Sequence, residues 1–213
     1  MEKALYFDLD GTLLQFDGDY QRIVTDAFER TVGRCEPEWH EIRNQAFFDA
    51  FENFDPNPYE AGMAAVTEHA NLDESPETLA AAWLDCEIEA TKPARAATDI
   101  LDALSETHRL GVLTNGVTHV QKRKLARHGL DEYLDAVVCS YDVGAHKPDP
   151  AMFETARDRL PAEAYVMVGD DKDADMRPAV EAGFMPIFVD SGAELPVEVR
   201  GLDGLAALVG VFG

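Results

Sequence analysis

Asp8 and Asp10 stand two residues apart at the end of a short apolar segment near the start of the chain. If that segment is a β-strand, both side chains project from the same face. Two neighbouring carboxylates repel each other, and their pKa values rise unless a cation lies between them. Gly11 and Thr12 follow at once and offer a tight turn and a hydroxyl. The pair therefore indicates a functional site.

Thr114, Asn115 and Gly116 form a second polar cluster, again after a short apolar segment. A hydroxyl, an amide and an unhindered backbone N–H can all donate hydrogen bonds to an oxyanion. A third candidate, Lys147, follows a glycine-containing loop and precedes an expected helix. Its ammonium can therefore point over the edge of a sheet.

The segment 169–175 is rich in acids and also follows an apolar segment. It holds four aspartates within six residues, Asp170, Asp171, Asp173 and Asp175. Mg²⁺ prefers hard oxygen ligands, binds a few carboxylates and keeps several waters. The segment therefore predicts a magnesium site.

The apolar pattern supplies a scaffold that can bring these clusters together. Five short runs are expected strands: Ala4–Leu9, Leu110–Leu113, Ala136–Ser140, Tyr165–Val168 and Pro186–Val189. Four helical stretches alternate with them: Ala96–Thr107, Thr118–His128, Pro150–Arg159 and Asp173–Ala182. Such alternation predicts an α/β fold with a doubly wound parallel sheet. Open parallel sheets bind ligands at the carboxyl ends of their strands, where all four clusters fall.

Residues 16–91 interrupt this alternation. They contain four helical patterns: Tyr20–Gly33, Glu38–Phe51, Tyr59–Ala70 and Pro76–Thr91. A structureless loop of this length would be unusual inside a compact domain. We therefore expect an α-helical domain at 16–91, inserted after the first strand of a catalytic core made of residues 1–15 and 92–213. The end of the chain offers one short helix, Leu202–Val209.

The charge of the chain is strongly negative. Its 41 acidic and 18 basic residues give a net charge of −23 and a pI near 4.4. Such a surface argues against nucleic acids and anionic membranes as partners. The composition is similar to that of proteins from salt-loving organisms, in which salt screens the repulsion between like charges. We therefore expect a halophilic protein that needs high salt to fold.

Other features concern the cellular location. No apolar run approaches the roughly 20 residues that a membrane-spanning helix needs. The start of the chain lacks the apolar region of a signal peptide, which predicts a cytoplasmic protein.

The chain has three cysteines without paired spacing. This pattern favours neither disulfides nor a zinc site, and each cysteine is expected to be a small buried residue.

Taken in chain order, the four clusters resemble the motifs of the haloacid dehalogenase superfamily, whose members are mostly phosphatases. Residues 8–12 are similar to the first motif, and residues 114–116 to the second. Lys147, in the setting Ser-x-x-Val-Gly-x-x-Lys-Pro, resembles the third motif, and Gly169-Asp170 with Asp175 resembles the fourth. The insertion falls where this family places a helical cap, so the resemblance spans nearly the whole chain.

The resemblance implies a role for each cluster. Asp8 would be the nucleophile of a phosphatase, and Asp10 its acid/base partner. Thr114 and Lys147 would hold the phosphoryl oxygens. Mg²⁺ would be the cofactor, held by Asp8, Asp170 and the backbone carbonyl of Asp10.

Two assignments in the fourth motif stay open. Asp175 resembles a second acid that lies near the metal or near the lysine. The family usually has a small or apolar residue after its first acid, whereas Asp171 stands there in this chain, so Asp171 is an alternative ligand. The substrate is expected to contact four residues of the first two clusters: Gly11, Thr12, Asn115 and Gly116.

Each cluster alone is compatible with an ordinary turn or a solvated surface, and only their joint order at strand ends favours catalysis.

Three alternative functions are compatible with this fold: a 2-haloacid dehalogenase, a phosphomutase and a non-enzymatic binding protein. Asp10 and the acids of the fourth motif count against the dehalogenase. A phosphomutase would keep every catalytic residue, whereas a binding protein is disfavoured because none is missing.

The expected substrate is a small phosphate ester, such as phosphoglycolate, a sugar phosphate or a nucleoside monophosphate. A helical cap that closes over the site would exclude larger phosphoproteins. Two segments are candidates for setting specificity, Gln15–Tyr20 and Asn53–Tyr59. The sequence indicates neither the particular ester nor the oligomeric state.

Overall fold

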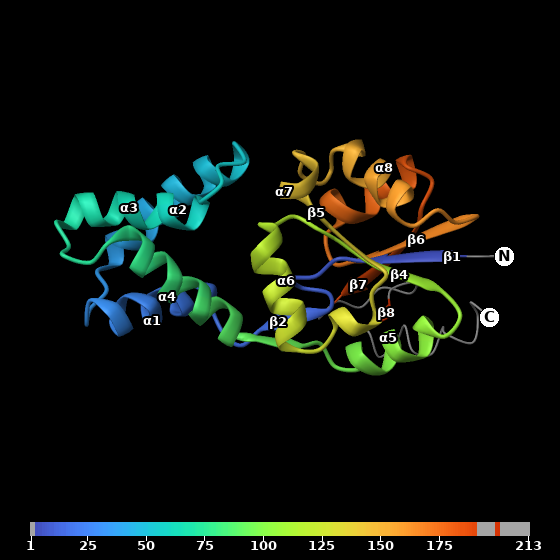
Figure 1. Cartoon of the computed structure of the whole chain (residues 1–213), viewed down its shortest axis with the longest axis horizontal. Coiled ribbons are helices and arrows are strands. Elements are labelled where there is room, and N and C mark those ends of the chain that lie inside the picture. The colour runs from blue at the N-terminus through green and yellow to red at the C-terminus, as the bar shows by residue number, and fades with distance from the viewer. Residues whose placement is uncertain (1–2, 191–198, 201–213) are drawn as a thin grey trace. The chain divides into compact units, whose positions relative to one another are not determined.

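A computed structural model describes residues 3–190 and the backbone of residues 199–200 (Figure 1). The chain divides into two compact units, Met1–Gln15 with Lys92–Gly213, and Phe16–Thr91. We call the first the α/β unit and the second the helical unit. The expected helix Leu202–Val209 lies outside the described residues.

The described residues of the α/β unit form a parallel sheet of six strands, in the order β5-β4-β1-β6-β7-β8. In the order of the chain the strands are β1 (Lys3–Phe7), β4 (Arg109–Thr114), β5 (Ala136–Cys139), β6 (Ala164–Gly169), β7 (Met185–Asp190) and β8 (Val199–Arg200). The central strand β1 pairs on both sides, with Leu5 opposite Leu110 of β4 and Val166 of β6. The predicted doubly wound parallel sheet is confirmed.

Helices cover both faces of this sheet, with α5 and α8 on opposite sides in Figure 1. The α/β unit contains α5 (Ala97–Ser105), α6 (Thr118–Arg127), α7 (Ser140–Val143), α8 (Pro150–Arg159), α9 (Arg177–Glu181), a 3-10 turn η1 (Asp131–Tyr133) and a π-helical turn η2 (Lys172–Met176). Alternate residues of β1 face alternate layers. Leu5 and Phe7 pack in a cluster with residues of α5, whereas Ala4 and Tyr6 pack in a cluster with residues of α8.

One expected helix, Asp173–Ala182, has a different form in the structure. The wide turn η2 comes first, and α9 begins only at Arg177. The Asp171 carboxylate accepts hydrogen bonds from the backbone N–H groups of Asp173 and Ala174 at 2.7 and 2.9 Å, which caps this turn. Pro178 has no N–H to donate to the carbonyl four residues earlier, so a regular helix cannot run through this position.

The helical unit contains α1 (Tyr20–Thr31), α2 (Pro37–Glu52), α3 (Pro58–Ala70) and α4 (Pro76–Glu89). The chain enters this unit through β2 (Leu14–Phe16) and leaves it through β3 (Thr91–Pro93), and these two short strands pair with each other. The expected helix Pro76–Thr91 was therefore too long, because its last residue belongs to β3.

Aromatic rings and a buried polar cluster fill the interior of the helical unit. Trp39 and Trp83 are almost fully buried, and the guanidinium of Arg43 lies 4.4 Å from the centre of the Trp83 ring. Glu87 is also buried and accepts a hydrogen bond from the Tyr20 hydroxyl at 2.6 Å. The cluster fixes the packing of α1, α2 and α4 against one another.

Two further findings bear on the sequence-based expectations. The three cysteines are free; Cys86 and Cys139 are buried as expected, but Cys35 is only partly buried. Within the part of the chain that the structure describes, no helix combines the length and apolar character needed to cross a bilayer.

Candidate active site

The four polar clusters meet at one edge of the sheet in the α/β unit. Asp8 follows β1, Thr114 ends β4, Lys147 follows α7, and Asp170 follows β6. They line one open cavity of about 220 Å³, together with five neighbours: Asp10, Asn115, Asp171, Ala174 and Asp175. The sheet therefore brings residues more than 160 positions apart in the sequence to within contact distance.

Lys147 lies at the back of this cavity, buried between two carboxylates. Its ammonium donates to Asp8 Oδ1 at 2.8 Å, to Asp175 Oδ1 at 2.6 Å and to the Leu113 carbonyl at 3.0 Å. An ammonium has three hydrogens, so all its donors are used. Burial alone would lower the pKa of Lys147, but the charges and hydrogen bonds of Asp8 and Asp175 outweigh it and raise the pKa.

For the pKa of Asp8, burial outweighs the effect of the neighbouring Lys147 charge. Burial raises the pKa of the Asp8 carboxyl from 3.8 to about 6, and the negative charge of Asp175 adds to this, although Lys147 acts against both. Burial likewise raises the pKa of Asp175, with Lys147 again opposing it. One lysine therefore does not fully stabilise the two buried carboxylates. A further cation would lower the free energy of the ionised site.

Three acidic residues that line the cavity suit a hard cation. One carboxylate oxygen from each of Asp8, Asp170 and Asp175 lies within 4.8 Å of the others. Burial and the charge of Asp8 raise the pKa of Asp170, as expected for acids crowded without a counter-ion. Three carboxylate oxygens and room for water match the preferences of Mg²⁺.

Gly11 leaves the space that the Asp170 carboxylate occupies. A β-carbon at Gly11, whose φ is +101°, would lie 2.3 Å from Asp170 Oδ2. The Thr12 hydroxyl donates to the other oxygen, Oδ1, at 2.9 Å. The turn after β1 therefore positions the Asp170 carboxylate as well as Asp8.

Asp171 and Asp175 have different environments from Asp170. Asp171 is exposed and caps η2 with its carboxylate, as described above, and it is not one of the three clustered acids. Asp175 is fully buried, with one oxygen bound to Lys147 and the other accepting from the Asp171 N–H at 3.2 Å. These contacts favour Asp170 over Asp171 as the ligand and place Asp175 closest to the lysine.

The side chain of Asp10 turns away from that cluster and towards α6. Lys124 donates to both of its carboxylate oxygens at 3.0 Å, and Gln121 donates to Oδ2 at 2.8 Å. Gln121 also donates to the Thr114 hydroxyl at 3.0 Å. Sequence reasoning missed both α6 residues, although their spacing of three places them on one face of the expected helix.

A family model described as haloacid dehalogenase-like hydrolase matches residues 2–183. The chain belongs to this family. A glyceraldehyde 3-phosphate phosphatase of Methanothermobacter thermautotrophicus is 29% identical over 218 residues, which cover 95% of this chain and 94% of the relative. The pyrimidine 5'-nucleotidase YjjG of Escherichia coli is 27% identical over 200 residues, 88% of this chain and 85% of the relative.

The fold comparison gives the same family. The crystal structure of a 2-haloacid dehalogenase from Pseudomonas syringae superimposes with a TM-score of 0.73 at 25% identity, covering all of both chains. The haloacid dehalogenase-like fold is therefore shared by proteins whose names give different reactions. Fold alone does not choose among them, so the choice must come from the site.

Asn115 and Gly116, both in the second motif, make hydrogen bonds to other residues of the protein. The Asn115 amide donates to the Lys147 carbonyl at 3.0 Å and accepts from the Lys147 N–H at 2.7 Å. The Gly116 N–H donates to the Ser140 hydroxyl at 2.9 Å. In this structure Asn115 holds the Lys147 loop in place, whereas Gly116 contacts the first residue of α7. Their expected contact with substrate stays a prediction.

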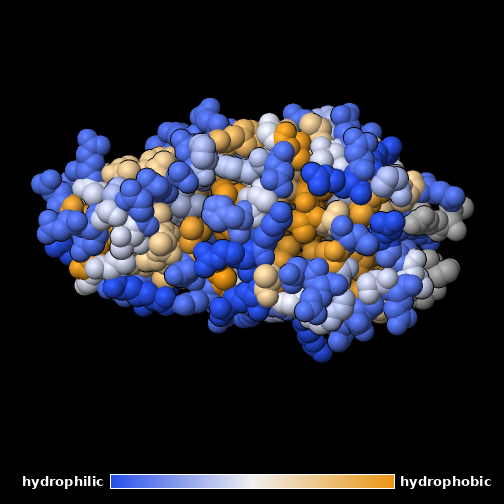
Figure 2. Space-filling model, in the orientation of Figure 1, coloured by the Kyte–Doolittle hydropathy of each residue, from blue (hydrophilic) through white to orange (hydrophobic). Residues whose placement is uncertain are grey.

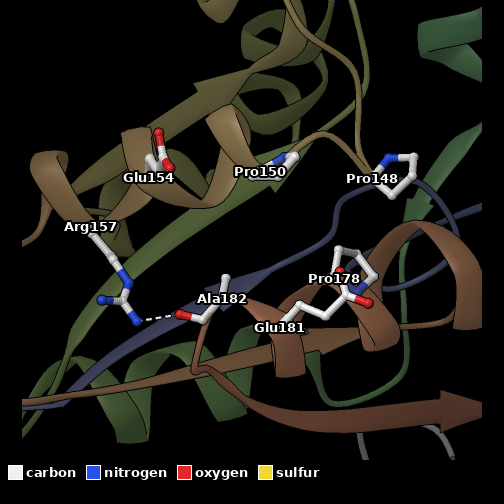
Figure 3. A pocket seen from close by; sticks show the side chains of 7 residues that line it. All are labelled: Pro148, Pro150, Glu154, Arg157, Pro178, Glu181 and Ala182. Carbon is white, nitrogen blue, oxygen red and sulfur yellow. Dashed lines mark hydrogen bonds between the residues drawn. The ribbon is translucent and has the colours of Figure 1, made fainter.

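A second cavity of the α/β unit lies between α8 and α9 and has a volume of about 250 Å³ (Figure 3). Three prolines, two glutamates and Ala182 line it, and the seventh residue, Arg157, donates to the Ala182 carbonyl. Although this cavity is the larger of the two, it contains none of the residues of the four family motifs except the neighbour Pro148. The candidate catalytic residues of this hydrolase family member, Asp8, Asp10, Thr114 and Lys147, all line the smaller cavity.

Proposed function

We propose that this member of the haloacid dehalogenase-like family is a Mg²⁺-dependent phosphatase that acts on small phosphomonoesters through a phospho-aspartate at Asp8. One observation carries the proposal. Asp8 is a buried carboxylate held by Lys147 at the base of an open cavity, with a second acid, Asp10, two residues away. A nucleophile beside a separate acid/base group is the arrangement that covalent phosphoryl transfer requires.

In the first step, a carboxylate oxygen of Asp8 attacks phosphorus. The bond from phosphorus to the ester oxygen breaks, and Asp10 gives a proton to the departing alcohol. In the second step, Asp10 takes a proton from a water molecule. The oxygen of that water bonds to phosphorus, the bond to Asp8 breaks, and inorganic phosphate leaves.

Other groups of the cavity stabilise the charge of the phosphoryl group. Lys147 fixes the orientation of the Asp8 carboxylate and would supply positive charge next to the phosphoryl group. The Thr114 hydroxyl, which lines the cavity, would hold a phosphoryl oxygen. Mg²⁺ would be held by Asp8, Asp170 and the Asp10 carbonyl. Asp175 would lie next to this site and bind Lys147. Bound Mg²⁺ would neutralise the repulsion between the anionic ester and the carboxylate nucleophile and orient the phosphoryl group.

A 2-haloacid dehalogenase is the main rival, since such an enzyme shares the fold. It needs no second acid beside the nucleophile and no cluster of carboxylates for a metal. This chain has both features. Asp10, bound by α6, is the second acid, and Asp8, Asp170 and Asp175 form the cluster of carboxylates. These observations favour the phosphatase.

The names of two relatives contain a substrate: one is a glyceraldehyde 3-phosphate phosphatase and the other a pyrimidine 5'-nucleotidase. Both substrates are small phosphate esters, which supports a small substrate for this chain. We propose that residues 16–91 form the cap that selects among such esters. The segments Gln15–Tyr20 and Asn53–Tyr59 are the candidates for contacting them. The names of the two relatives give different substrates, so the particular ester has to be measured.

The test is release of inorganic phosphate from a panel of small phosphomonoesters, in molar KCl, with Mg²⁺ or with EDTA. The account predicts release with Mg²⁺, its loss in EDTA, and none from the Asp8→Asn variant. 2-Chloropropionate is included in the panel. Chloride release from it, without phosphate release from any ester, would identify a dehalogenase instead.

A further inference from the structure

The acid/base candidate Asp10 is bound by α6 through three hydrogen bonds to its carboxylate. Lys124 Nζ lies 3.0 Å from Oδ1 and 3.0 Å from Oδ2, and Gln121 Nε2 lies 2.8 Å from Oδ2. The Lys124 side chain is 3% exposed, whereas the Asp10 side chain is 28% exposed and lines the open cavity. The donors are therefore behind the acid, and the acid faces the reaction space.

These contacts leave the two carboxylate oxygens unequal. A carboxylate offers about four acceptor positions, two on each oxygen. Among the described residues, two donors bind Oδ2, while only Lys124 binds Oδ1. Oδ1 thus keeps an acceptor position, and it is the oxygen better placed to exchange a proton in the cavity.

Gln121 couples this arrangement to the second motif. The two hydrogens of its amide go to Asp10 Oδ2 and to the Thr114 hydroxyl, at 2.8 and 3.0 Å. Because an amide nitrogen has two hydrogens, both are used. The amide therefore sets the distance between the candidate acid/base and a candidate ligand of the phosphoryl group.

The path of the Gln121 side chain needs the glycine at position 116. A β-carbon at Gly116 would lie 2.7 Å from Cγ, Cδ and Nε2 of Gln121. Contacts that short do not occur, so any larger residue would displace the amide. This gives Gly116 a function in the site that is separate from substrate binding.

The burial of Lys124 is matched by an acid that also lines the cavity. Burying an ammonium is costly unless it is paired, and a partner inside the protein would serve. Lys124 pairs with Asp10, an acid that is partly exposed and lines the open cavity. A second α6 residue binds the same acid and aligns it with Thr114.

We propose that Lys124 and Gln121 are positioning residues that orient the Asp10 carboxylate, with Oδ1 towards the cavity, for proton transfer to the leaving alcohol and from water. This inference rests on the proposed phosphatase function. It assigns no contact with substrate to either residue. It concerns the proton transfers of Asp10, not the attack by Asp8.

Leaving-group dependence distinguishes positioning from general damage to the fold. p-Nitrophenolate leaves without receiving a proton, whereas the alkoxide of an alkyl phosphate requires one. We would measure the rate of phosphoenzyme formation in single turnovers with p-nitrophenyl phosphate and with the best alkyl phosphate of the panel. Using this first step excludes any effect on the later attack by water.

For Lys124→Met and for Gln121→Leu, we expect the alkyl rate to fall by about 10²-fold, as for loss of general acid catalysis. The p-nitrophenyl rate should fall by less than about tenfold, KM should stay unchanged, and Lys124→Arg should recover part of the alkyl rate. The matched control is Lys122→Met, which removes an exposed ammonium from the same helix and should change neither rate.

An equal loss for both esters, or no loss for either, would overturn the proposal. If Lys124→Met fails to fold, the uncharged change Gln121→Leu carries the same test. If the wild-type protein hydrolyses no ester, the proposed function fails instead. Crystal structures of the wild type and Gln121→Leu then test the positioning directly, and an unchanged Asp10 carboxylate would contradict it.

Discussion

The ammonium of Lys147 lies 2.8 Å from Oδ1 of Asp8, and the two residues are 139 positions apart in the sequence. The same ammonium contacts Asp175 at 2.6 Å, so one buried cation serves two buried carboxylates. The account gives this contact two functions. It stabilises the nucleophile as an anion, and it provides positive charge near the transferring phosphoryl group.

Replacing Lys147 with Met should affect both stability and rate. Removing one partner of a buried ion pair costs about 3–5 kcal/mol, and loss of one such electrostatic contact lowers kcat by about 10²–10³-fold. Chemical unfolding and phosphate release measure the two effects. Lys122→Met, which removes an exposed lysine outside the site, is the control. Wild-type stability in Lys147→Met would contradict the structural part of the account.

Mg²⁺ binding should depend on Asp170 and not on Asp171. The Asp170 carboxylate belongs to the cluster of three acids, whereas Asp171 caps η2, a function that Asn can also perform. We expect Mg²⁺ to raise the Tm of the wild type and of Asp171→Asn. Asp170→Asn should bind Mg²⁺ at least about tenfold more weakly, a loss of about 1.4 kcal/mol. Titration calorimetry measures this directly, and equal affinities of the two variants would contradict the assignment.

The pH dependence of stability should reveal the buried charge of Asp8. Because burial raises the pKa of Asp8 to about 6 from 3.8, the folded protein holds this proton more tightly than the unfolded chain does. The resulting stability is present below about pH 4 and is lost as the pH rises through about 6. The full effect is about 3 kcal/mol, at 1.36 kcal/mol for each pKa unit.

Asp8→Asn removes this charge and should therefore stabilise the metal-free protein at pH 7.5. The gain over wild type should shrink as the pH falls towards 4, because the wild-type carboxyl is then neutral as well. Denaturant titrations in EDTA at several pH values measure the difference. A variant that is less stable than wild type at pH 7.5, or a difference that does not change with pH, would contradict the account.

The net charge of −23 should make the fold depend on salt. Figure 2 shows hydrophilic residues spread over the visible face. The acidic residues are scattered along the sequence and do not form one acidic run. Screening by molar KCl should weaken their mutual repulsion. If this adds about 2 kcal/mol, the Tm rises by about 4–8 °C. A neutral osmolyte at equal osmolality is the control, and a Tm that does not change between low salt and molar KCl would refute the expectation.

The sheet and the positions of the four polar clusters were predictable because their signals are local. A parallel strand buried on both faces is a short apolar run, and Asp8 and Asp170 stand directly after such runs. The sequence Asp149-Pro150 predicts the start of α8, and the structure confirms it, with the Asp149 carboxylate accepting from the Ala151 N–H at 2.9 Å.

The contacts of Lys124 and Gln121 with Asp10 were not predictable in the same way. A lysine on a helix usually lies at the surface, and nothing near Lys124 in the sequence indicates an acid 114 positions earlier. Its burial follows from the tertiary packing of α6. The short elements α7, β2 and β3 were missed for a related reason, since three or four residues carry almost no periodic signal.

The most direct test of the central claim is to find the phosphoryl group on Asp8 during turnover. The enzyme would be mixed with Mg²⁺ and its best ester, quenched in acid, digested with pepsin and examined by mass spectrometry. The account predicts that the peptide containing Asp8 gains the mass of one phosphoryl group, and that Asp8→Asn does not. Phosphate release by a wild-type enzyme that never carries this group on Asp8 would contradict it.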